Sequence, residues 1–132
     1  MDAHRFRSPL GRAIGLGSAK TGFGHWWTER ITALALIPLS AWFAASLIAY
    51  SGSGYQAFAG WIGSPVTTVL MILLLITLFW HAALGLQVVI EDYVHSAAKI
   101  WMLLTTHFVC FALATAGIVA TLRVAVGVWS AI

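Results

Sequence analysis

Charged residues and cysteine are the two things that this sequence has least of. Only 8% of its 132 residues are charged, whereas 61% are hydrophobic, which is far from the composition of an ordinary soluble domain. The single cysteine, Cys110, excludes a disulfide within the chain and an iron–sulfur cluster held by its own cysteines. The composition therefore predicts a membrane protein, and one domain at most.

A nucleotide-binding motif is also missing. The segment GLGSAKTG is similar to a phosphate-binding loop, but Ala19 stands where that loop has a glycine before its lysine, and no strand precedes it. The chain has no dinucleotide-binding fingerprint elsewhere. We therefore expect no nucleotide chemistry on this chain itself.

The few basic residues are concentrated near the start, and after them no charged residue occurs before Glu91. They are Arg5, Arg7, Arg12, Lys20 and Arg30. This asymmetry favours a cytoplasmic amino terminus over nucleic-acid binding. Residues 1–27 are expected to form a cytoplasmic segment without a cleaved signal, because they lack a continuous apolar core. Glycines and Pro9 also make them a poor organellar presequence, which favours the bacterial cytoplasmic membrane over the mitochondrial inner membrane.

Three apolar runs are long enough to cross a bilayer, which needs about 20 residues in a helix. They cover residues 28–50, 64–90 and 98–128, and together predict an all-α anchor of three transmembrane helices over 28–132. Pro38 should kink the first helix, and Ser64 followed by Pro65 is a typical helix start. A bundle this small buries little of itself, so we expect a partner chain.

His81 is the residue that most needs an explanation. It lies about 24 Å along the second predicted helix, inside the hydrocarbon, where an ionisable side chain is costly and by default functional. It could bind haem iron, relay protons or hydrogen-bond to another helix. Gly85 and Asp92 lie on the same helix face, and the glycine could accommodate either a flat macrocycle or a close helix.

Glu91, Asp92 and Tyr93 end this second run, and the acids must lie at the water boundary because each would cost about 3 kcal/mol at the membrane centre. A tyrosine at that depth is explained by its amphipathic ring alone. A tyrosine hydroxyl beside a carboxylate would also suit a quinone, which needs a hydrogen-bond donor and a route for protons. The residues alone leave both explanations open.

Four short segments stand out in the chain: HAALG at 81–85, QVV at 87–89, DYVH at 92–95, and RITA at 30–33. Together they resemble a known family, the small hydrophobic membrane-anchor subunit of succinate dehydrogenase, the succinate:quinone oxidoreductase of the respiratory chain. The three-span length is also similar. The resemblance is specific between about His25 and Lys99 and adds little outside those residues.

The resemblance implies roles for individual residues. His81 would be an axial ligand of a b-type haem whose second ligand is a histidine of a sister anchor subunit. Tyr93 would hydrogen-bond ubiquinone with Asp92 as its acidic neighbour, and Arg30 would face the haem propionates. His25 could lie near the propionates or quinone, although its position beside Trp26 and Trp27 also suits an interfacial residue.

The resemblance further implies an iron–sulfur subunit and a flavoprotein subunit as partners, which would oxidise succinate and deliver electrons to the quinone. The isolated chain would then be inactive. A fumarate reductase anchor, running the reaction in reverse, has the same pattern. A structural or transport bundle without cofactor is the alternative from another class. His107 lies about 12 Å into the third helix, and we expect it to hydrogen-bond to another helix.

Overall fold

The protein is described by a computed structural model that covers residues 20–130, and every described element is a helix. The elements are α2 (Lys20–Tyr50), α3 (Tyr55–Gly63), α4 (Pro65–Tyr93) and α5 (Ala98–Trp129). Three of them, over Gly22–Tyr50, Pro65–Tyr93 and Ala98–Trp129, are long and apolar enough to cross a membrane. The predicted all-α membrane protein with three spanning helices is confirmed.

The first helix starts earlier than the apolar run that predicted it. It begins at Lys20 rather than near residue 28, and it continues through Pro38 to Tyr50. The apolar run marks the part of the helix suited to hydrocarbon, whereas backbone hydrogen bonding continues through the aromatic and polar residues before it. Most of the expected cytoplasmic segment, and most of GLGSAKTG, lies outside the described residues.

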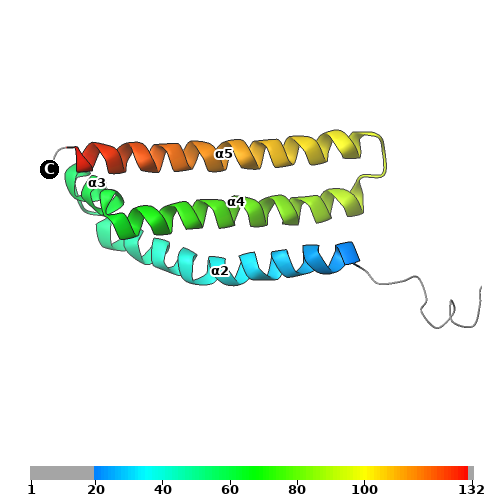
Figure 1. Ribbon diagram of the computed structural model, residues 1–132, viewed down its shortest axis with the longest axis horizontal. Coiled ribbons are helices and arrows are strands. Elements are labelled where there is room, and N and C mark those ends of the chain that lie inside the picture. Colours follow the sequence, from blue (N-terminus) through cyan, green and yellow to red (C-terminus); the bar gives the residue numbers. More distant parts are fainter. Residues whose placement is uncertain (1–19, 131–132) are drawn as a thin grey trace, which may run out of the picture.

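Helix α4 is the central element of the bundle. It packs against α5 along one side and against α2 along another, while α2 and α5 make no comparable contact with each other in the described chain. Figure 1 shows α4 between α2 and α5, with each long helix antiparallel to the long helix before it in the chain. A residue of α4 can therefore face either neighbour or the open side between them.

The two ends of the bundle differ in charge. One end gathers the start of α2, the end of α4 and the start of α5 (Figure 1), and with them Arg30, Glu91, Asp92 and Lys99. The opposite end carries α3 and the end of α5. Arg123, exposed on α5, is the one charged residue of the described chain in that second half. The acids thus lie outside the apolar part of α4, as their cost in hydrocarbon requires.

The start of α4 is set by its cap. The Ser64 side chain accepts a hydrogen bond from the Thr67 backbone nitrogen at 3.3 Å, and Pro65 occupies the first turn. The Thr68 hydroxyl donates to the Ile62 carbonyl oxygen at 2.8 Å and so ties α4 to the end of α3. The helix start predicted from Ser64 and Pro65 is confirmed.

Helix α3 lies in the glycine-containing segment between the first two predicted spans, where the sequence predicts no helix. Its Trp61 is buried against Met71 and Leu74 of α4. The ring of Tyr50, at the end of α2, stacks on Trp61 with centroids 5.2 Å apart. This aromatic cluster packs α3 against the end of α2 and the start of α4, at the end of the bundle opposite Glu91 and Asp92.

The contact between α3 and α5 requires a glycine. A Cβ at Gly63 would lie 2.8 Å from the Cβ of Val128, which is closer than carbon atoms approach. The adjacent Trp129 donates from Nε1 to the Gly63 carbonyl oxygen at 2.6 Å, which supplies a partner for a carbonyl at the end of α3. Close backbone approach and a cross-helix hydrogen bond thus occur at the same glycine.

We predict that Gly63→Ala destabilises the bundle, whereas Gly60→Ala does not. Both glycines lie in α3 and gain the same helix propensity, but a Cβ at Gly60 meets nothing within 4 Å. The overpacking should cost about 1–3 kcal/mol, measured as a lower midpoint of thermal unfolding for purified protein in detergent. Equal midpoints for the two variants would contradict the close contact.

Candidate functional site

The candidate site begins with a hydrogen bond between two spanning helices. His81 of α4 and Thr32 of α2 approach each other with Nδ1 and Oγ1 2.9 Å apart. Thr32 lies twelve residues after the start of α2 at Lys20, and His81 lies twelve residues before the end of α4 at Tyr93. Both are therefore about 18 Å from the charged end of the bundle, and both are half-buried.

The face of α4 that runs from His81 toward the charged end is open at Gly85. A Cβ built on Gly85 meets no heavy atom within 4 Å. Within the described chain this glycine is therefore not required for close packing of two helices, which was one of the two explanations from sequence. Its small size leaves space beside the histidine for a group or chain that comes from outside.

Glu91, Asp92 and Tyr93 form the last turn of α4, and all three are exposed. Glu91 is held in place, because its Oε1 accepts a hydrogen bond from Gln87 Nε2 at 2.9 Å and its carbonyl oxygen accepts one from Lys99 Nζ at 3.4 Å. Tyr93 is 81% exposed. The phenol and the Asp92 carboxylate are thus available at the end of the helix that carries His81.

The two expected propionate contacts lie on different sides of α2. Arg30 is exposed, and its Cζ lies 5.1 Å from the centroid of the Trp26 ring, a distance suited to a cation–π interaction. It is two residues from Thr32, or about 200° around the helix, whereas half-buried His25 is seven residues away and about 20° off the same face. His25 therefore lies on the same face of α2 as Thr32, about two turns closer to the start of the helix, whereas Arg30 lies on the opposite face.

His107 belongs to a different part of the structure, and its expected bond to another helix is wrong. Its Nδ1 is 2.9 Å from the carbonyl oxygen of Leu103, one turn back on the same helix. Exposure of the ring allows this local bond to replace an interhelical one.

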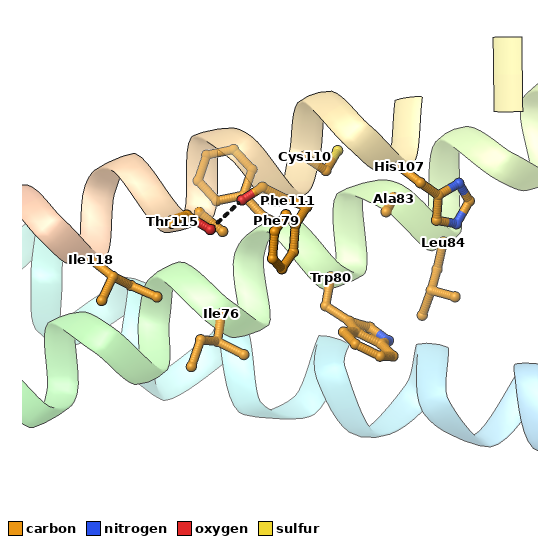
Figure 2. Close-up of a pocket in the computed structure, with 11 residues that line it drawn as sticks. Ile76, Phe79, Trp80, Ala83, Leu84, His107, Cys110, Phe111, Thr115 and Ile118 are labelled. Atoms are coloured by element: carbon orange, nitrogen blue, oxygen red, sulfur yellow. Dashed lines mark hydrogen bonds between the residues drawn. The ribbon is translucent and has the colours of Figure 1, made fainter. Parts of the chain in front are cut away.

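A groove of about 550 Å³ between α4 and α5 includes His107 in its lining but not His81. Figure 2 shows the ring of His107 on α5 and the side chains of Trp80 and Leu84 on α4 at this groove. The rest of the lining is almost entirely apolar; the one further hydroxyl, on Thr115, donates to Phe111 in its own helix. The two histidines therefore do not form a common site in this chain.

Comparison with known proteins decides the family. The model of the succinate dehydrogenase/fumarate reductase transmembrane subunit matches residues 4–120. The chain belongs to this family. The match takes in α2, α3, α4 and most of α5, and so includes every candidate residue above.

Curated relatives of this succinate dehydrogenase/fumarate reductase family carry a consistent name. The succinate dehydrogenase hydrophobic membrane anchor subunit of Rickettsia bellii is 37% identical over 89 residues, which cover 67% of this chain and 71% of the relative. The subunit of the same name from Paracoccus denitrificans is 25% identical over 123 residues, covering 93% and 95% of the two chains. No solved structure matched significantly.

Membership of the family agrees with the architecture. A transmembrane subunit requires membrane-spanning helices, and α2, α4 and α5 have the length and apolarity to span. These relatives are bacterial, which is consistent with a bacterial inner membrane.

Proposed function

We propose that this chain is a membrane-anchor subunit of a succinate dehydrogenase, and that it contributes one axial ligand to a b-type haem and part of a ubiquinone site. The observation that carries the haem proposal is the position of His81. A histidine lies deep within a spanning helix, bonded through Nδ1 only, beside an open glycine. The relatives named as succinate dehydrogenase anchors support the wider assignment.

The residues around His81 fit a haem. Within the described chain no hydrogen bond involves Nε2 of His81, so this atom is available as a metal ligand. The open space at Gly85 would accept a flat ring against the backbone. A haem held here would accept and return single electrons within the membrane.

The second axial ligand would come from a sister anchor subunit. In the described residues His107 lines a separate groove, and no group of three potential metal-binding side chains occurs. No residue in the apolar span of α2 is buried within the described chain. Much of the surface of α2 is therefore free for lipid or a second chain. A haem shared between the two chains would cover part of this surface. Half-buried His25, on the face of α2 that carries Thr32, would then be the nearer partner for a propionate. Exposed Arg30 would pair with a propionate only by turning its long side chain away from Trp26 and around α2.

Ubiquinone would bind at the charged end of α4. The Tyr93 hydroxyl would donate a hydrogen bond to a quinone carbonyl, and the Asp92 carboxylate would pass protons from water. Both side chains are exposed at the end of the helix, where the apolar tail of a quinone and the aqueous phase are both within reach. This end would face the cytoplasm together with the basic amino terminus.

Electrons would come from soluble subunits, because this chain has one cysteine and no dinucleotide-binding motif. A flavoprotein subunit would oxidise succinate, and an iron–sulfur subunit would pass the electrons to the quinone. The complex would be in the bacterial cytoplasmic membrane. The reverse reaction, fumarate reduction, uses the same arrangement, and the family description includes both; a cofactor-free bundle is the competing proposal.

We predict that His81→Ala removes the b-type band from the dithionite-reduced minus oxidised spectrum of the purified complex. The variant lacks the ligand nitrogen, whereas the control His107→Ala should keep the band because that ring lies in the other groove. A band that persists in His81→Ala and disappears in His107→Ala would move the ligand to α5. The absence of a band in the wild type would favour the cofactor-free bundle.

We predict that Tyr93→Phe retains haem but reduces quinone more slowly. Loss of one hydrogen bond to the substrate, worth about 1 kcal/mol, should lower the rate roughly fivefold in a steady-state assay with a soluble ubiquinone. Tyr55→Phe is the matched control, since Tyr55 is 76% exposed and starts α3 at the opposite end of the bundle. Equal quinone kinetics in all three proteins would make Tyr93 an interfacial residue only.

A further inference from the structure

The hydroxyl of Thr32 is close to three polar atoms at once. Its Oγ1 is 2.8 Å from the carbonyl oxygen of Thr28 and 3.0 Å from that of Glu29, both in the preceding turn of α2. It is also 2.9 Å from Nδ1 of His81 on α4. A hydroxyl has one proton, so these three contacts limit its direction.

The two carbonyl oxygens can only accept hydrogen bonds. If the hydroxyl proton pointed to His81, the lone pairs of Oγ1 would face both carbonyl oxygens at 3.0 Å or less, which is repulsive. The favourable arrangement is for Thr32 to donate to the carbonyl oxygens and to accept from Nδ1–H of His81. In a neutral imidazole with the proton on Nδ1, the lone pair is on Nε2.

We propose that Thr32 is a positioning residue that holds His81 in the tautomer and ring orientation needed for Nε2 to bind iron. The inference rests on the proposed haem ligation by His81 and adds a role for α2 to it. Thr32 does not touch the iron in this proposal. It acts through the histidine, as the outer hydrogen-bond partners of metal-bound histidines do.

The hydrogen bond also affects the strength of the ligand. A partner that accepts the Nδ1 proton increases the basicity of the imidazole, and a more basic ligand stabilises ferric over ferrous iron. Removing the acceptor should therefore raise the midpoint potential of the haem. It should also lower haem affinity, because an unpaired N–H in the membrane interior is costly and the ring is no longer oriented.

The test compares Thr32→Val with Thr32→Ser in the intact, purified complex. Valine keeps the shape of threonine but has no hydroxyl, whereas serine keeps the hydroxyl. Thr28→Val is the matched control: Thr28 lies one turn away on α2, and its hydroxyl donates to Gly24 in the same way, without a contact to His81. Haem content, haem retention against a haem-scavenging protein and the midpoint potential are measured for each.

We expect Thr32→Val to lose haem affinity by about 10-fold to 100-fold, the usual effect of removing an outer partner, with a higher midpoint potential. Thr32→Ser and Thr28→Val should remain close to the wild type in both readouts. If Thr32→Val does not assemble, Thr32→Ala is judged by the same readouts. A wild-type potential and wild-type haem retention in the hydroxyl-free variant would overturn the role of Thr32.

The His81→Ala variant separates this inference from the proposed function. Loss of haem in His81→Ala together with unchanged haem in Thr32→Val would leave the ligand in place and reject Thr32 alone. A band that survives in His81→Ala would reject the ligand and the positioning role together. A shift confined to the potential of Thr32→Val, with normal thermal unfolding of the complex, would support positioning over a merely structural contact.

Discussion

The lack of water in the membrane interior is the constraint on which this structure depends. Polar groups there have to find partners within the protein, and no buried side-chain nitrogen or oxygen of the described residues is left without one. Thr28, Thr32, Thr115 and Thr121 all donate to carbonyl oxygens of the preceding turn. Of these four, only Thr32 has a further contact, to His81, and this is the one hydrogen bond between side chains of two different spanning helices in the described residues.

Three of the candidate site residues, His81, Asp92 and Tyr93, lie on the central helix α4. Because α4 contacts both neighbours, His81 can be held by α2 while the open face at Gly85 is left for a bound group. The same helix ends in Asp92 and Tyr93 at the charged end. The opposite end is packed by Trp61 and by the contact of Gly63 with α5, and the side chains of Ser64, Thr68 and Trp129 add hydrogen bonds there.

Exposure of apolar residues elsewhere fits a subunit rather than a complete anchor. Leu34, Ile37 and Ile48 of α2 are each more than half exposed, and no large side chain of the described residues is fully buried. Lipid covers such surfaces as readily as protein does. The family is one of transmembrane subunits, and the α2 side is the surface on which we propose that a second chain packs.

The sequence by itself determined the number of spans, the start of α4 and the family, because apolar length, a Ser-Pro cap and short motifs are local properties. It also singled out His81, since a histidine at that depth is costly in any fold. It could not reveal that α3 is a helix, because burial of Trp61 by α2 and α4 decides this. Nor could it show that His107 hydrogen-bonds within its own helix, or that Thr32 forms a hydrogen bond with His81, 49 residues further along the chain. Those facts depend on which helix faces which, and only the packing of the tertiary structure decides that.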